Sequence, residues 1–252
     1  MANHVSKNEA GLARQIEFFC RADSTPGPHP IPRSCEVKNE LHSIFSIKAG
    51  MRDVTVENPL EADAFIFEEG QIDIVSLCEQ SPRINGAILN RPYYTFDYST
   101  RYLDTRTVHK EVKEDYKLEL LDDGRRCPPG WLHIEAWCRT HGEQCAFITE
   151  LDLEPHQQFI RNWRTLLPFA RAGYEDFDAA LEKSILTHVS RAGRLTVAEV
   201  HAAEASSVTE HVMEHIAKLL HQGRLVADLH ELPVSPITAL SIRHQDANDA
   251  TG

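Results

Sequence analysis

The sequence contains no apolar run long enough to span a membrane, and its first residues, MANHVSKNEAG, lack the apolar core of a signal peptide. A spanning helix needs about 20 mainly apolar residues, and a secretory leader needs an apolar stretch of about 7 to 15. The six cysteines among 252 residues are unevenly spaced, unlike the framework of a small disulfide-rich secreted domain. No internal repeat or low-complexity tract occurs. We therefore expect a cytoplasmic protein with no membrane part.

Positive charge is also scarce. Lysine and arginine total 26 against 38 aspartate and glutamate residues, which gives a net charge of −12. Affinity for nucleic acid rests largely on lysine and arginine side chains that meet phosphates. An acidic protein that acts on DNA is therefore expected to be delivered by partners, although the same charge suits a protein that never touches DNA. The length and the 42% hydrophobic content are sufficient for two domains.

The stretch YYTFDYSTRYLDTRTVHKEVKED predicts two β-strands joined by a turn. The first strand, Tyr93–Tyr102, is rich in aromatic and β-branched residues, and the second is Thr107–Lys113. A turn centred near Asp104 places Asp97 opposite Glu111. Directly opposed residues have β-carbons about 5 Å apart, so the two carboxylates should converge.

Glu111 and Lys113 are two residues apart and so share a face of their strand. Two carboxylates and a lysine on one patch can hold a hard divalent cation and activate a water against a phosphodiester. The competing interpretation is that a Glu-x-Lys pair on a strand is merely solvated charge. The elements around the hairpin favour the site.

Asn58 and Pro59 form a helix start, with Asn58 as N-cap and Pro59 at the first helical position. The segment LEADAFIFEEG continues this helix, and Gly70 suits its end. Glu61 lies in the first turn. Spacing alone favours a pairing of Glu61 with the helix dipole, and the alternative is a third carboxylate aimed at the metal site.

The remaining segments predict a strand in QIDIVSLCEQ, a helix after Pro128-Pro129 that ends near Gly142, a strand in CAFIT and a helix in LEPHQQFIRNWRTLLPFA. From residue 58 the order is helix, three strands, helix, strand, helix. The first six elements resemble the common core of the restriction-endonuclease-like fold, an α/β fold whose active site carries a PD-(D/E)xK pattern. A likeness of fold does not establish function.

A second domain is predicted after Gly173. Asp178–Arg191 and Thr196–Ala203 are expected helices, and Ser206 or Ser207 should cap a third helix that runs to His221. GRLVADLHELPVSPITALSIR then gives two short strands, so the segment predicts a winged helix. Such domains usually bind DNA, but the candidate recognition helix carries Glu210 and Glu214 against a single Lys218. Docking to a protein is the better interpretation.

Short motifs between residues 42 and 170 resemble those of the TnsA family, the endonuclease subunit of heteromeric bacterial cut-and-paste transposases. FSIKAGMRDVTVENPLEADAFIFEEGQIDIVSLCEQ contains a Phe-Ser-x-Lys stretch, a Leu-Glu helix and a strand that ends in Glu-Gln. Tyr94-Thr95-Phe96-Asp97-Tyr98, Glu111-Val112-Lys113 and Thr149-Glu150 follow in the family's order. Phe96 stands where the family has proline, and Ser81-Pro82 replaces a direct Gln-Pro.

The resemblance implies a magnesium-dependent DNA endonuclease, a hydrolase that cuts the 5′ strands at transposon ends during excision. It assigns Asp97, Glu111 and Glu61 to Mg²⁺, with Mn²⁺ as a substitute, and Lys113 to the orientation or deprotonation of the attacking water. The implied partners are transposon-end and donor DNA, a DDE transposase subunit (TnsB-like) that acts on the 3′ strands, and an AAA+ ATPase regulator (TnsC-like) reached through the winged helix.

The expected organisation is an N-terminal extension (1–57), an endonuclease-like domain (58–172), a winged-helix domain (173–243) and a disordered tail (244–252). The extension would include a helix at Asn8–Arg21. Two other functions stay open: a stand-alone PD-(D/E)xK restriction or repair nuclease, and a non-catalytic winged-helix adaptor.

A zinc site is a further alternative. Its candidate ligands are Cys138, His141 and Cys145, with Cys127 and His133 nearby. Their spacing fits no standard zinc pattern, and several of them fall on a helix packing face.

Overall fold

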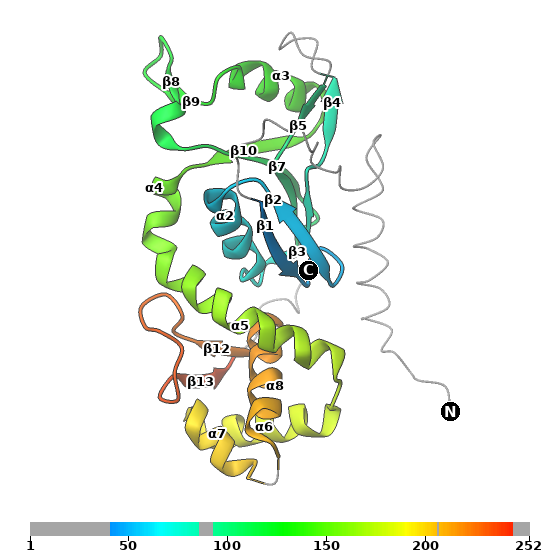
Figure 1. Cartoon of the computed structure of the whole chain (residues 1–252), viewed down its shortest axis with the longest axis vertical. Coiled ribbons are helices and arrows are strands. Elements are labelled where there is room, and N and C mark those ends of the chain that lie inside the picture. Colours follow the sequence, from blue (N-terminus) through cyan, green and yellow to red (C-terminus); the bar gives the residue numbers. More distant parts are fainter. Residues whose placement is uncertain (1–40, 86–92, 206, 244–252) are drawn as a thin grey trace, which may run out of the picture. The chain divides into compact units, whose positions relative to one another are not determined.

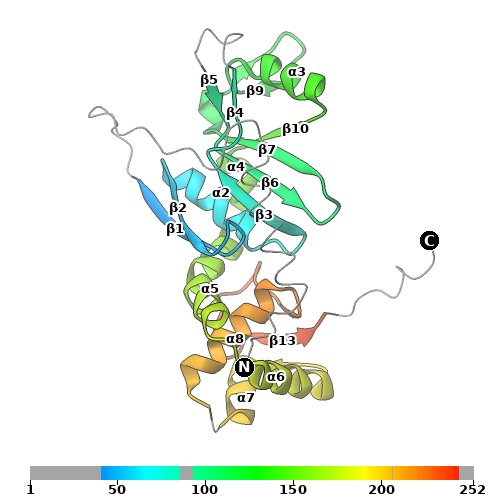
Figure 2. The ribbon, with the colours of Figure 1, turned by 90° about the vertical axis from the view of Figure 1, so that its right-hand side faces the viewer.

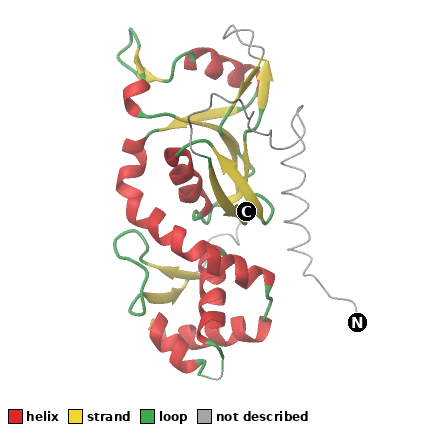
Figure 3. Ribbon diagram, in the orientation of Figure 1, coloured by secondary structure: helices red, strands yellow, loops and turns green. Residues whose placement is uncertain are grey.

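The computed structural model describes residues 41–85, 93–205 and 207–243 (Figure 1). The chain has a mixed α/β architecture and divides into two compact units, Met1–His156 and Gln157–Gly252. Helices and strands are distinguished in Figure 3. Within the described ranges, no helix is both long and apolar enough to cross a bilayer. The helix expected at Asn8–Arg21 and the tail at 244–252 lie outside the described residues.

The first unit combines several small sheets with short helices. Its strands are β1 (His42–Ser46), β2 (Arg52–Val56), β3 (Ile74–Glu79), β4 (Arg83–Asn85), β5 (Tyr93–Thr95), β6 (Tyr98–Tyr102), β7 (Thr107–Val112), β8 (Glu119–Leu120), β9 (Arg126–Cys127) and β10 (Gln144–Ile148). Its helices are α2 (Pro59–Glu69), α3 (Trp131–His141) and α4 (Glu150–Leu153), with 3₁₀ turns at Asp115–Lys117 and Glu154–His156.

The central sheet has the strand order β10-β7-β6-β3 (Figure 2). Strands β3, β6 and β7 form an antiparallel meander, and β10 pairs with β7 in parallel. The register of β6 and β7 pairs Tyr98 with Lys110 and Ser99 with His109. One further step along this register brings Asp97 opposite Glu111, as the position of the turn at Asp104 predicted.

One expected strand is divided into two. The segment Tyr93–Tyr102 breaks at Phe96 and Asp97, because its two halves pair with different partners. Strand β5 pairs with β4, whereas β6 pairs with β3 and β7. Asp97 therefore lies at the position where the chain passes from one sheet to the next.

Helix α2 begins where the sequence predicts. The side chain of Asn58 accepts a hydrogen bond from the backbone N–H of Glu61, Pro59 occupies the first turn, and Gly70 is the C-cap residue. The helix packs against β1, β3 and β7. Its first turn is thereby fixed beside the central sheet.

The described part of the expected N-terminal extension belongs to the first unit. Strands β1 and β2 form a hairpin over residues 42–56, which the sequence did not predict. Lys48 lies in the turn of this hairpin and is buried, and its amine donates to the carbonyl oxygens of Glu68 in α2 and of Gln71 just after it. The buried Glu69 carboxylate accepts from Ser46 Oγ at 2.6 Å, so the hairpin is joined to α2.

The cysteines proposed as zinc ligands take part in packing. Cys127 and Cys138 are buried in an apolar cluster with Trp131 and Ile134, and Cys145 packs against it. The Cys138 and Cys145 thiols are hydrogen-bonded to each other. These contacts favour the packing interpretation.

The second unit contains helices and one small antiparallel sheet. Its elements are α5 (Gln157–Glu175), α6 (Ala179–Ala192), β11 (Leu195–Thr196), α7 (Val197–Ala203), α8 (Thr209–His221), β12 (Leu225–Ala227) and β13 (Ala239–Ile242). The sheet order is β11-β13-β12. Asp178 is the N-cap residue of α6. The N-cap residue of α8 is Val208, with no side-chain cap, rather than the expected serine.

The units divide at residues 156 and 157, whereas the sequence analysis placed the domain boundary at 172 and 173. The reason is that α5 packs closely on the elements that follow it. The Asn162 side chain donates to the carbonyl oxygens of Leu229 and Leu232 at 2.8 Å and accepts from Val234 N at 2.8 Å. Gly173 lies so close to the Glu214 carbonyl that an added β-carbon would be 2.5 Å from its oxygen.

Candidate active site

Asp97 is held at the break between β5 and β6. Its Oδ2 accepts a hydrogen bond from the backbone N–H of Val112 at 2.7 Å, and its carbonyl oxygen accepts from Gln80 N at 2.7 Å. The first bond joins Asp97 to the end of β7, within two residues of both Glu111 and Lys113. The hairpin register and this bond therefore fix the carboxylate beside the Glu-x-Lys segment.

Glu111 and Lys113 interact directly, because Lys113 Nζ lies 2.8 Å from Glu111 Oε1. The other carboxylate oxygen of Glu111 accepts a hydrogen bond from the hydroxyl of Tyr94 on β5. Glu111 and Tyr94 are buried, whereas about a third of the Lys113 side chain is exposed. The lysine thus presents its amine at the accessible side of a buried carboxylate.

Glu61 has a structural role at the start of α2. Its Oε2 accepts from the backbone N–H of Glu57 at 2.8 Å, and its Oε1 accepts from the Asn58 side chain. Glu61 is buried, with 6% of its surface exposed. It therefore closes the start of α2 through its side-chain hydrogen bonds.

The ionisation of these residues shows that Glu61 also lies close to the hairpin site. Burial raises the pKa of Glu61 from 4.5 to about 7, and the charge of Glu111 adds to this rise. Burial also raises the pKa of Asp97 well above its ordinary value, followed by the charges of Glu111 and Glu61. Burial lowers the pKa of Lys113, but the charge and hydrogen bond of Glu111 outweigh it and leave this pKa raised. Glu61, Asp97 and Lys113 are thus near enough to Glu111 for its charge to act on their pKa values.

The donor types in this cluster fit a hard cation. Carboxylate oxygens are the ligands that Mg²⁺ prefers. A cation would offset the burial and the carboxylate repulsion that together raise the pKa values of Glu61 and Asp97. The side chains do not converge on a common point, however. Across the described ranges, no group of three or more His, Cys, Asp or Glu side chains is arranged to hold a metal. The chemical types of these residues suit Mg²⁺. To bind the cation, their carboxylate oxygens would have to give up hydrogen bonds that they now accept.

Two neighbouring groups were missed by the sequence analysis. Tyr94, which binds Glu111, belongs to an aromatic run with no signal of function. His109 precedes Glu111 by two residues on the same strand, and its Nδ1 lies 2.7 Å from Ser99 Oγ while its Nε2 lies 3.4 Å from Glu143. Ser99 is buried and donates to the Ser81 carbonyl. Serine, histidine and glutamate are the residue types of a hydrolase triad. The hydroxyl of Ser99 already donates to a backbone carbonyl, however, so we assign these residues to a structural hydrogen-bond network.

A cavity of about 330 Å³ lies elsewhere in the first unit. Its lining includes Glu68, Lys110, Tyr102, Asp73 and His156. Lys110 forms a buried ion pair with Glu68 and hydrogen-bonds to Tyr102 at 3.0 Å. The charges of Lys110 and Glu68 neutralise each other, and neither residue is one of the four predicted site residues.

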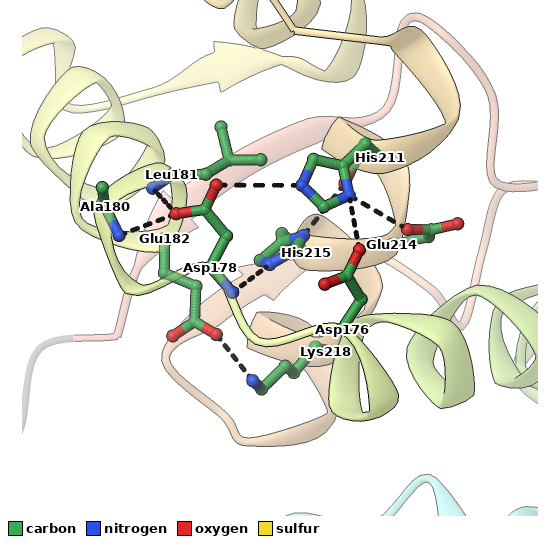
Figure 4. A network of polar contacts seen from close by, with 9 residues as sticks. All are labelled: Asp176, Asp178, Ala180, Leu181, Glu182, His211, Glu214, His215 and Lys218. Atoms are coloured by element: carbon green, nitrogen blue, oxygen red, sulfur yellow. Dashed lines mark hydrogen bonds and ion pairs between the residues drawn. The ribbon is translucent and has the colours of Figure 1, made fainter. Parts of the chain in front are cut away.

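In the second unit, acidic groups surround His211 of helix α8, one from α8 itself and two from the segment between α5 and α6 (Figure 4). His211 Nδ1 lies 3.3 Å from Glu214 and 3.9 Å from Asp176, and His211 Nε2 lies 3.8 Å from Asp178. The lysine of this helix, Lys218, is buried and forms an ion pair with Glu182 at 2.7 Å. The accessible part of α8 is therefore poor in positive charge.

The sequence matches no protein-family model and no curated protein. The resemblance to the TnsA family therefore stays a prediction, and the function has to be argued from the site.

Proposed function

We propose that the chain is a metal-dependent DNA endonuclease whose active site is formed by Glu61, Asp97, Glu111 and Lys113. One observation carries this proposal: Glu61 on α2, Asp97 at the β5–β6 break and Lys113 just after β7 lie close enough to Glu111 for its charge to shift their pKa values. Groups of buried acids with strongly raised pKa values are more common at functional sites than elsewhere.

The topology supports a restriction-endonuclease-like core. Helix α2 is followed by the meander β3-β6-β7, then by α3 and by β10, which is parallel to β7. In such a core, Asp97 and the Glu111-x-Lys113 segment would occupy the two positions of a PD-(D/E)xK pattern. After α5, the second unit has the order helix, strand, two helices and two strands that a winged helix would require.

Asp97, Glu111 and Glu61 would hold Mg²⁺, which supplies a water of lowered pKa and positive charge near the scissile phosphate. The bond from Val112 N keeps Asp97 in place, and the Tyr94 hydroxyl orients Glu111. Lys113 has a raised pKa and stays protonated at neutral pH. We therefore assign it to orienting the attacking water and to stabilising the negative charge that develops on the phosphate, rather than to accepting a proton.

The acidic composition favours a subunit that depends on partners. We propose the role of the endonuclease in a heteromeric transposase, which cuts the 5′ strands at transposon ends beside a DDE transposase and an AAA+ ATPase. The test is a cleavage assay on end-labelled transposon DNA with Mg²⁺, carried out with the protein alone and with both partners. Nicks at the 5′ strands that need the partners and are abolished by Asp97→Ala support the proposal.

The same assay separates the alternatives. Efficient cleavage by the protein alone, lost in Asp97→Ala, would indicate a stand-alone nuclease. An Asp97→Ala protein that supports full excision would contradict the proposed site and favour an adaptor.

A further inference from the structure

Helix α5 has two faces of different chemistry. Its buried side is apolar and consists mainly of Phe159, Ile160, Trp163, Leu166, Leu167 and Ala170. Its exposed side carries Arg161, Arg164 and Arg171. The spacing of three and seven residues places these arginines along one side of the helix. We call Arg161, Arg164 and Arg171 the arginine face.

The arginine face stands out against the charge of the chain, which has a net charge of −12. Arg161 donates to the Gln158 side chain at 3.1 Å, and Arg171 pairs with Glu175 at 2.9 Å. The Arg171 pair is exposed, with side-chain exposures of 44% and 54%. Exposed pairs of this kind stabilise a protein by less than about 1 kcal/mol, so an anion of higher charge can replace the glutamate.

Helix α8, which would be the DNA-reading helix of a winged helix, cannot take this role. Most of its residues are buried, and α5 packs along it, with Gly173 against the Glu214 carbonyl. Its accessible residues include Glu210 and Glu214, and Lys218 is buried against Glu182. A DNA backbone that approached α8 would meet negative charge.

We infer that the arginine face of α5 binds the phosphates of a DNA backbone, an inference that rests on the proposed function. Planar guanidinium groups bind phosphate oxygens through two parallel hydrogen bonds. Arg161 and Arg171 are ten residues apart, which is about 15 Å along a helix. That length matches about four nucleotides of one strand, at about 3.4 Å each. The contact is to the backbone and carries no sequence specificity.

The test measures binding of a fluorescent duplex to the full-length chain by anisotropy, without Mg²⁺ so that no cleavage occurs. The variant is Arg161→Gln/Arg164→Gln/Arg171→Gln. The control, Arg125→Gln/Arg191→Gln/Arg194→Gln, removes the same charge at three other exposed arginines. Polyglutamate serves as a competing anion, and circular dichroism checks that all three proteins are folded.

Three lost phosphate contacts should lower the slope of log affinity against log salt by about 2.7. Between about 50 and about 200 mM salt, the wild-type affinity should therefore fall about 40-fold more than that of the arginine-face variant. The control should keep a slope close to that of the wild type.

Three results would overturn the inference: a wild-type protein that does not bind the duplex at about 50 mM salt, equal losses in variant and control, or equal binding of polyglutamate and duplex. The last result would indicate an acidic protein segment as the occupant. Because no cleavage is measured, the outcome is separate from that of the proposed active site. Loss of 5′-strand cutting in Asp97→Ala, with duplex binding intact, is expected if both proposals hold.

Discussion

Replacement of Glu61 by glutamine should make the protein more stable at neutral pH. The folded chain raises the pKa of Glu61 from 4.5 to about 7, so the folded state holds this proton more tightly than the unfolded state. The free energy of unfolding therefore falls as pH rises from about 4.5 to about 7. Each pKa unit corresponds to about 1.4 kcal/mol, which gives a loss of about 3 kcal/mol at pH 7 and above.

Glutamine cannot ionise, so the Glu61→Gln protein should lack this loss. It also keeps one side-chain oxygen to accept from Glu57 N. The measured quantity is the melting temperature of variant and wild type from about pH 4.5 to about pH 8. For a chain of this size, about 3 kcal/mol corresponds to about 6 to 12 °C. The variant's advantage should grow by that amount over this pH range.

A cation should reverse the order of the two proteins. Mg²⁺ or Mn²⁺ at pH 8 should stabilise the wild type, because it offsets the repulsion among Glu61, Asp97 and Glu111, and should stabilise Glu61→Gln less. Glu119→Gln, which removes an exposed carboxylate of the first unit, is the control and should behave as the wild type. A difference in melting temperature between Glu61→Gln and the wild type that does not change with pH would refute the raised pKa of Glu61 in this cluster.

Three further results are expected. Asp97→Ala and Lys113→Ala should each abolish 5′-strand cleavage in a folded protein, and transposition should shift from excision to joined products, as read on gels of end-labelled DNA. Gly173→Ala should lower the free energy of unfolding of the second unit by about 1 to 3 kcal/mol, because the new β-carbon would meet the Glu214 carbonyl at 2.5 Å; unchanged denaturation would contradict the close helix contact. Burial lowers the pKa of Lys48 from 10.5 to about 8, so the free energy of unfolding of the wild type should rise by about 3 kcal/mol between pH 8 and 10.5. Lys48→Met should lack this rise, and the same rise in the variant would show that Lys48 is solvated.

Local signals in the sequence predicted several features correctly. Asn58 and Pro59 fix the start of α2 by capping chemistry within four residues. The turn at Asp104 fixes the register of β6 and β7, because antiparallel neighbours pair symmetrically about a short turn. These features depend on residues that are close in the chain, so they can be read from one segment at a time.

Other features depend on contacts between distant segments. Lys48 is buried because the carbonyl oxygens at the end of α2, 20 and 23 residues further on, accept from its amine. The Tyr94 hydroxyl reaches Glu111 because β5 does not continue in the sheet of β6 but pairs with β4. Both residues stand in the short motifs noted in the sequence, but no local pattern specifies these partners, because the partners are set by the packing of distant segments.

The candidate site combines both kinds of contact, which bears on how it would work. The Asp97–Glu111 approach follows from a local hairpin, so it should form whenever that hairpin forms. Glu61 joins these residues only through the packing of α2 against the sheet, and its oxygens are already satisfied by Glu57 N and the Asn58 side chain. Its release from this cap would cost the start of α2 two hydrogen bonds, each worth about 1 kcal/mol. A cation that draws Glu61 into the site must supply at least that free energy, and contacts from DNA and partner subunits would add to it. Such a site would become complete on assembly, which agrees with the expectation that the protein does not cut DNA efficiently by itself.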